Sequence, residues 1–214
     1  MEWIETASGN RISKQAHIHG SDHILIAGNT TVSAQVELKG DVRIVEGKTS
    51  IQIGKFVYLG ENVRVVPPFL GNKMSSSKGI EVAVHKICKI GSYTMIGEDS
   101  VIKASNVGSR VMIGKGCTLQ DSCVIHDCVV IKDNSYIPEH FNIPPFSLVF
   151  PQLDEYKEDI TTTTTTTTTS TINELKDRPK PISIIPLPES YKKIIESYSK
   201  QSYINNQFTA SEIP

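Results

Sequence analysis

An aliphatic residue returns every six positions through much of this 214-residue chain, and this period constrains the fold more than any other feature. The run is clearest from Ile90 to Val149, with one five-residue step between Ile102 and Val107. A small side chain follows four positions after most of these residues, as Thr94 follows Ile90. A period of six matches neither a helix nor the simple alternation of a strand. A tandem repeat of this kind is typical of a parallel β-helix, in which short strands stack coil on coil.

The geometry of a triangular coil explains the pattern. If three short strands close one coil, the leading aliphatic residue points inward and only a small side chain fits beside it near the corner. Burying one such residue contributes roughly 1.5 to 3 kcal/mol, so one coil is marginal and a series of coils forms a core. The predicted inward residues of the main run are Ile90, Ile96, Ile102, Val107, Ile113, Leu119, Ile125, Ile131, Ile137, Ile143 and Val149. The predicted fold class is all-β, a parallel β-helix of about six coils with a C-terminal amphipathic α-helix.

Breaks in the period divide the chain into segments. The expected segments are an N-terminal cap over 1–25, a β-helix over 26–150 with loop insertions at 45–52 and 66–83, a flexible linker over 151–187, a helix over 188–205 and a tail over 206–214. In the second insertion, prolines and glycines disfavour a regular strand and serines favour a mobile loop. Nine consecutive threonines, Thr161 to Thr169, lie in the linker and have too little apolar surface to offset the entropy of ordering.

The repeat frame also predicts an apolar outer surface. The residue before each inward aliphatic side chain points outward from the same strand, and every third such residue shares one face of the prism. One face carries only apolar residues, namely Met95, Met112, Val130 and Leu148. The predicted helix has an apolar side of its own, formed by Tyr191, Ile194, Ile195 and Tyr198. Because an unbroken exposed apolar stripe usually marks a contact, we expect either this helix or a second β-helical subunit to cover it.

Charge and cysteine content narrow the possible functions. The chain has 22 basic and 23 acidic side chains, so we expect no nucleic-acid partner. No apolar stretch approaches the length needed to cross a bilayer, so we expect no membrane insertion and a cytoplasmic location. Three of the four cysteines take the small inward position, and we expect all four to be reduced core residues: Cys88, Cys117, Cys123 and Cys128.

Several blocks of sequence resemble one family of hexapeptide-repeat proteins. The opening E-W-I-E-T-A-S-G-N-R-I-S, the block V-V-P-P-F followed by S-K-G-I, and the run I-G-S-Y-T-M-I-G-E-D-S-V-I-K-A-S-N-V-G-S are similar to the dynactin subunit 5 family. The resemblance covers residues 2 to about 150, with a weaker echo in the C-terminal helix. The threonine tract departs from the family. Hexapeptide β-helices of this superfamily are left-handed, so the resemblance also implies the handedness of the coil.

The resemblance implies a non-catalytic role. Members of this family lie at the pointed end of dynactin and help to link cytoplasmic dynein to cargo for microtubule-based transport. The implied partners are dynactin subunit 6 as a heterodimer, the pointed-end actin-related protein and other dynactin subunits, and indirectly dynein and cargo adaptors. The implied location is the cytoplasm and its cytoskeleton.

An enzyme of the same superfamily is the alternative. When the zinc-ligand patterns of gamma carbonic anhydrases are laid on this sequence, the three histidine positions fall on Val66, Glu98 and Lys103. Valine cannot bind zinc and a lysine ammonium repels it, so we expect no metal, no cofactor and no catalytic residues. A divergent anhydrase, or an acyltransferase that uses His85 as a general base, stays open as an alternative.

Overall fold

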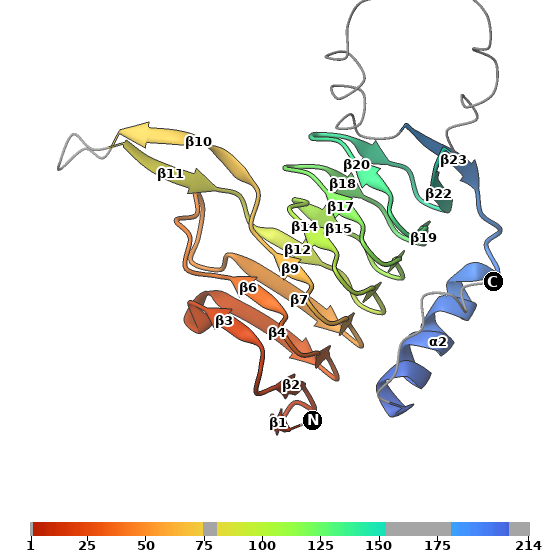
Figure 1. The fold of residues 1–214 in the computed structure, drawn as a ribbon, viewed down its shortest axis with the longest axis horizontal. Helices are drawn as coiled ribbons and strands as arrows, with labels where there is room; N and C mark the ends of the chain where they lie inside the picture. Colours follow the sequence, from red (N-terminus) through yellow and green to blue (C-terminus); the bar gives the residue numbers. More distant parts are fainter. Residues whose placement is uncertain (1, 75–80, 153–180, 206–214) are drawn as a thin grey trace, which may run out of the picture.

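Three mainly parallel sheets form the body of the protein in a computed structural model that describes residues 2–74, 81–152 and 181–205 (Figure 1). Sheet A contains, in spatial order, β1 (Trp3–Glu5), β2 (Arg11–Ser13), β5 (Thr31–Val32), β8 (Tyr58–Leu59), β13 (Met95–Ile96), β16 (Met112–Ile113), β19 (Val129–Ile131), β22 (Ser147–Pro151) and β23 (Ile182–Pro186). Sheet B contains β3 (His17–His19), β6 (Glu37–Lys39), β9 (Arg64–Val65), β14 (Val101–Ile102), β17 (Thr118–Leu119) and β20 (Tyr136–Ile137). Sheet C contains β4 (Ile24–Gly28), β7 (Ile51–Lys55), β12 (Cys88–Ile90), β15 (Asn106–Val107), β18 (Val124–Ile125) and β21 (Asn142–Ile143).

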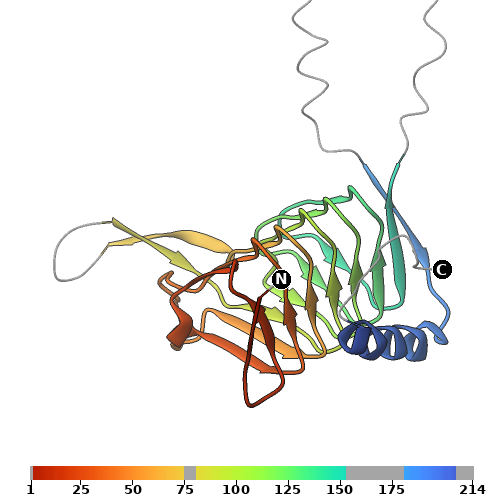
Figure 2. The ribbon, with the colours of Figure 1, turned by 60° about the horizontal axis from the view of Figure 1, so that its bottom comes forward.

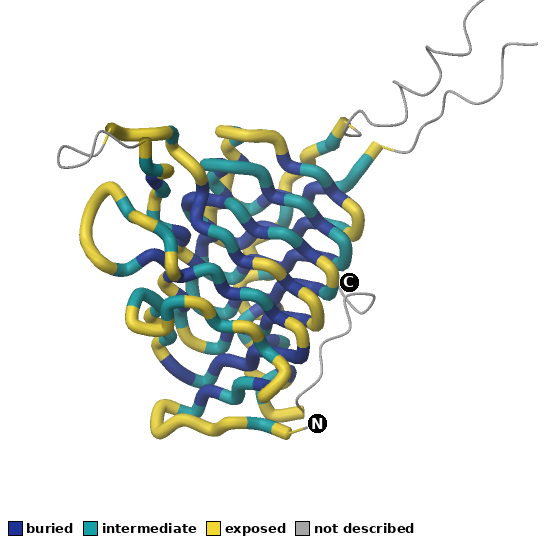
Figure 3. The backbone as a smooth tube through the Cα atoms, turned by 60° about the vertical axis from the view of Figure 1, so that its left-hand side comes forward, coloured by how far each residue is buried: buried dark blue, intermediate teal, exposed yellow. Residues whose placement is uncertain are grey.

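The chain winds through the three sheets in a fixed order, so each residue lies beside its equivalent in the next coil. In sheet A, Ile96 pairs with Ile113 and Ile113 with Ile131. All eleven predicted inward residues from Ile90 to Val149 are buried, which confirms the frame of the repeat. Figure 3 shows that buried positions recur from coil to coil along the whole body. The fold is therefore mostly β with parallel sheets, and the described residues form one α-helix, α2 (Tyr191–Asn205).

Tight corners join the strands, and most of them use a residue in the left-handed region of backbone conformation. The corners between sheets C and A place Asn29, Phe56, Tyr93, Arg110, Cys128 and Phe146 at φ values between 50° and 60°. Glycine is needed at positions where adjacent coils approach closely. A Cβ atom on Gly91 would lie 2.5 Å from the carbonyl carbon of Gly108 in the next coil. A side chain is therefore excluded at Gly91, where the backbones of adjacent coils are nearly in contact.

The expected N-terminal cap over 1–25 is wrong in most of its length. Strands β2, β3 and β4 pair in parallel with β5, β6 and β7, so this segment already contributes to all three sheets. A 3-10 helix, Ser21–His23, lies between β3 and β4. Only β1, which pairs antiparallel with β2, covers a sheet edge. The reason is that Ile12, Ile18 and Ile24 pack against the core, although polar neighbours obscure their period in the sequence.

Both insertions also differ from expectation. The first ends at Ser50, because β7 begins at Ile51. The second forms an antiparallel hairpin of β10 (Phe69–Met74) and β11 (Glu81–His85), where the sequence predicted a loop without strands. The hairpin projects from the body on the side away from α2 (Figure 2). Its apolar residue Val84 is buried at the base, which anchors the hairpin despite the prolines before it.

The expected linker over 151–187 is partly strand. β23 pairs antiparallel with β22, and Ile184 lies opposite the inward residue Val149. Ile182 packs against the core, so apolar contact at the last coil explains why this short segment forms a strand. The threonine tract and the rest of 153–180 lie outside the described residues, as does the predicted tail over 206–214. The helix starts at Tyr191, three residues after the predicted boundary.

Candidate docking surface on sheet A

The predicted apolar stripe forms one continuous row on the outer face of sheet A. Strand register places Met95 beside Met112, Met112 beside Val130, and Val130 beside Leu148. The side chains of Met95, Met112 and Val130 are 0%, 2% and 1% exposed, although they point away from the prism. Something must therefore cover them from outside. The covering element is α2, which lies along this face (Figure 1).

Ile195 is the centre of the helix contact. It is fully buried and packs in one cluster with Met95, Met112 and Val130. Tyr58, Leu148, Leu187, Tyr191 and Tyr198 are partly buried around this cluster. A 15-residue helix is marginal in isolation, so the apolar face it buries on sheet A accounts for most of its stability. The structure thus brings together the two apolar surfaces that the sequence predicted separately.

Ile194 does not belong to this contact, contrary to expectation. Its side chain is 41% exposed and, with Lys193, Ser197, Tyr198 and Gln201, it lines an open surface on the helix. The buried helix positions are Ile195, Ser199 and Ser202, at spacings of four and three. Because each residue turns the helix by about 100°, Ile194 faces sideways when Ile195 faces the sheet.

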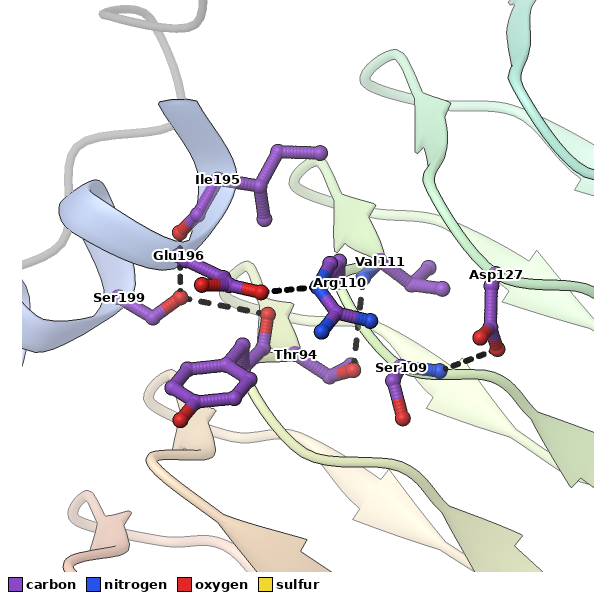
Figure 4. A network of polar contacts seen from close by, with 9 residues as sticks. Thr94, Ser109, Arg110, Val111, Asp127, Ile195, Glu196 and Ser199 are labelled. Atoms are coloured by element: carbon purple, nitrogen blue, oxygen red, sulfur yellow. Dashed lines mark hydrogen bonds and ion pairs between the residues drawn. The ribbon is translucent and has the colours of Figure 1, made fainter. Parts of the chain in front are cut away.

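Polar contacts border the apolar cluster (Figure 4). Arg110 forms an ion pair with Glu196. The Ser199 hydroxyl donates to the carbonyl oxygen of Ile195 (2.6 Å) and also lies 3.3 Å from that of Tyr93. The hydrogen bond from Arg110 lowers the pKa of Glu196 below its ordinary 4.5. The same bond raises the pKa of Arg110. Both charges therefore persist at neutral pH, and they fix the helix against the corner that carries Arg110.

A second set of contacts attaches the end of the helix to the first coil. The Tyr203 hydroxyl donates to the carbonyl of Gly9 (2.8 Å), and Arg11 donates to the carbonyl of Tyr203 (2.7 Å) while its guanidinium lies over the Tyr203 ring. Tyr203 also packs edge-on against Phe56, which stacks on Tyr93 at 5.5 Å. The helix therefore joins the first coil to the later coils of sheet A.

Sequence reasoning did not identify Phe56, Tyr93 and Arg110 as contact residues. All three lie three positions after an inward aliphatic residue, at corners between sheets C and A. A bulky side chain at a left-handed corner is uncommon. One signal in the sequence could have identified them. Aromatic and arginine side chains recur at equivalent corners of three successive coils, next to the apolar stripe.

The residues that align with the zinc-ligand patterns serve other interactions. Glu98 pairs with Lys115 at 2.9 Å, and Lys103 pairs with Asp121 at 3.7 Å. The Val66 N–H donates to the carbonyl of Ile102 as part of the stacking of coils. His85 bonds through Nδ1 to the carbonyl of Pro67 at 2.9 Å. Among the residues that the structure describes, no three His, Cys, Asp or Glu side chains are grouped to bind a metal ion.

The cysteines are buried and free of disulfides. Burial raises the pKa of Cys88, Cys117 and Cys123 to about 12 each. Burial also raises the pKa of Cys128, which occupies a left-handed corner. These thiols are protonated near neutral pH and poor nucleophiles.

Comparison with known proteins identifies one family. A family model described as dynactin subunit 5 matches residues 1–167. A protein of Dictyostelium discoideum named dynactin subunit 5 is 32% identical over 108 residues, which are 50% of this chain and 48% of that protein. The chain therefore spans about half the length of this curated relative. No helix in the described ranges is long and apolar enough to cross a membrane.

The comparison with solved structures finds matches at low sequence identity. An N-acyltransferase of Bacillus cereus, solved with dTDP and coenzyme A, is 12% identical, covers 92% of this chain and 89% of its own, and superposes with a TM-score of 0.53. A hexapeptide transferase family protein of Anaplasma phagocytophilum is 11% identical, covers 92% of both chains and gives a TM-score of 0.42. The likeness to the N-acyltransferase concerns the fold alone.

Proposed function

Because this chain belongs to the dynactin subunit 5 family, we propose that it is a non-catalytic subunit of dynactin. The proposed place is the pointed end of the complex, where the subunit helps to link cytoplasmic dynein to cargo for microtubule-based transport. The proposed partners are dynactin subunit 6, as a heterodimer, the pointed-end actin-related protein and other dynactin subunits, and indirectly dynein and cargo adaptors. The proposed location is the cytoplasm and its cytoskeleton. The match of the family model over residues 1–167 carries this proposal.

The architecture is consistent with a rigid spacer. The stacked coils resist bending, because each inward side chain packs against its equivalents in the coils above and below. The α2 helix occupies sheet A, so neighbouring subunits would bind the other faces or the projecting hairpin. We further propose that the coil is left-handed, as in the hexapeptide-repeat proteins that the sequence resembles. An experimental structure of the chain would decide the handedness directly.

An affinity purification tests the proposed function. The full-length tagged chain is expressed in its own cells, washed at increasing salt, and the bound chains are identified. We expect dynactin subunits, including subunit 6, to remain bound. A monodisperse homotrimer without any dynactin subunit would contradict the proposal.

A zinc and activity assay tests the enzymatic alternative. With valine at 66 and lysine at 103, we expect the purified chain to contain no stoichiometric zinc and to leave carbon dioxide hydration at the background rate. Bound metal together with measurable turnover would favour a divergent anhydrase instead.

A further inference from the structure

The outer face of sheet B has a charged half and a neutral half. Strand register aligns one outward residue from each strand, in the order His17, Glu37, Arg64, Val101, Thr118 and Tyr136. The first three residues are polar or charged, whereas Val101 and Tyr136 present apolar atoms. Both are only partly buried. Unlike sheet A, this face does not carry α2 (Figure 1).

Cations outnumber carboxylates in the charged half. Glu37 accepts a hydrogen bond from Arg64 (2.9 Å) and forms an ion pair with Lys39 (3.4 Å), so one carboxylate is shared by two cations. Burial acts to raise the pKa of Glu37, but Arg64 and Lys39 outweigh it and the pKa lies below 4.5. The side chains of Arg64 and Lys39 are still 49% and 36% exposed. His19, which lies 3.9 Å from the same carboxylate, adds positive charge when it is protonated.

The next cation in the same face is neutralised differently. Lys103 is the residue after β14, and it pairs with Asp121 (3.7 Å). The other carboxylate oxygen of Asp121 accepts a hydrogen bond from the N–H of Phe69 at the base of the hairpin. Asp121 therefore fixes the hairpin and compensates Lys103 at once. The cluster of Lys39, Arg64 and Glu37 keeps one net positive charge, and it lies next to the neutral row from Val101 to Tyr136.

We propose that this face of sheet B binds a neighbouring protein surface that presents carboxylates opposite Lys39 and Arg64 and apolar side chains opposite Val101 and Tyr136. Charge complementarity favours this occupant, because the net positive charge of Lys39, Arg64 and Glu37 would repel a basic partner. Exposed arginine beside aromatic and aliphatic atoms is also typical of protein interfaces. The proposal rests on the proposed function, under which the neighbour is another dynactin subunit.

Three variants of the full-length chain test the surface by the sign of their effects. The double variant Lys39→Gln/Arg64→Gln removes both cations and leaves the Glu37 carboxylate without them, whereas Glu37→Gln removes the carboxylate and leaves both cations free. Lys89→Gln, on the outer face of sheet C, removes an exposed cation elsewhere and is the matched control. Each tagged variant is used to purify dynactin subunits from cells over a series of KCl concentrations, and the identified subunits are quantified. Thermal melts of each variant check that it is folded.

The proposal predicts opposite changes. We expect the double variant to retain at most about one tenth of the dynactin that the wild type retains. Retention by this variant should also depend little on KCl concentration, because the charged contacts that salt screens are gone. Glu37→Gln should retain more than wild type at high salt, and Lys89→Gln should match wild type. The proposed surface would be overturned if the folded double variant retained as much dynactin as Lys89→Gln does. It would also be overturned if Glu37→Gln retained no more dynactin than the wild type. Failure of the wild-type chain to retain any dynactin subunit would overturn the proposed function itself.

Discussion

Corner residues with a left-handed backbone conformation determine which side chains contact the helix. Residues other than glycine adopt this conformation at a cost of order 1 kcal/mol or more each, and the coil repeats it at most corners. At the junction of sheets C and A, the corner places Phe56, Tyr93 and Arg110 beside α2. The strained corner is thus also the position from which a long side chain can reach across the prism edge.

The ion pair between Arg110 and Glu196 leads to a pH-dependent prediction. Because Arg110 lowers the pKa of Glu196 in the folded state, the stability it contributes is present above the ordinary value of 4.5 and is lost as pH falls through the lower folded value. Replacing Glu196 with Gln should destabilise the protein by no more than about 1 kcal/mol at pH 7, since the pair is partly exposed. Urea unfolding of both proteins over a pH series measures the difference. A difference that stays constant down to pH 3 would contradict this account.

The buried thiols make a second prediction at this scale. With pKa values of about 12 at Cys88, Cys117 and Cys123, the folded protein should react with a chromogenic disulfide reagent at least a hundredfold more slowly than the unfolded chain. Adding guanidinium should release all four thiols. Rapid reaction of any of these three in the folded protein would show that its coil opens locally.

At the scale of the element, α2 depends on the sheet that it covers. Its sequence contains two adjacent isoleucines, and only Ile195 points at the stripe of Met95, Met112 and Val130. Two contacts at its end, from Tyr203 and Arg11, join it to the first coil. The helix therefore forms because the apolar surface and the end contacts outweigh the entropy of ordering 15 residues.

The adjacent isoleucines provide a matched pair of variants. Ile195→Asp places a charge against a buried apolar cluster and should detach α2, with loss of its helical circular dichroism and rapid proteolysis within 191–205. Ile194→Asp, at a half-exposed position, should leave both signals near wild type. Equal effects of the two substitutions would show that the helix does not depend on its contact with sheet A. Met112→Asp and Val130→Asp should reproduce the Ile195→Asp result from the sheet side.

At the scale of the whole molecule, the prism is a linear stack in which every coil is covered by its neighbours. Ile113 is fully buried between Ile96 and Ile131 in adjacent coils. A cavity in one coil therefore weakens contacts on both sides of it. Stability should depend most on the middle of the stack, where each inward residue has two covering neighbours.

A cavity substitution tests this arrangement. Ile113→Ala should lower the free energy of unfolding by about 2 to 5 kcal/mol, the range for buried isoleucine. Val101→Ala, on the outer face of sheet B, is the control and should cost less than about 1 kcal/mol, since its side chain is only partly buried. Urea denaturation gives both values. If Ile113→Ala costs no more than Val101→Ala, Ile113 does not point into the prism.

The local period was enough to predict which residues point inward and which form the apolar stripe. The inward series from Ile90 to Val149 and the row from Met95 to Leu148 both follow from counting by six, because burial recurs with the same period as the coil. Counting did not predict the hairpin of β10 and β11 or the placement of β23, since their partners are set by contacts outside the repeat. It also missed Arg110 and Tyr93, whose contacts with the helix span 86 and 106 residues of sequence.

The sequence by itself determined a stacked core and an outer stripe that needed a cover, because a side chain's direction in a regular strand is a local property. Only the tertiary structure decided that α2 is the cover, that Ile195 and not Ile194 faces the stripe, and that the first coil begins at Arg11. These features depend on the fit between surfaces distant in the chain. Such a fit depends on contacts between distant segments, and the period of the sequence does not predict it.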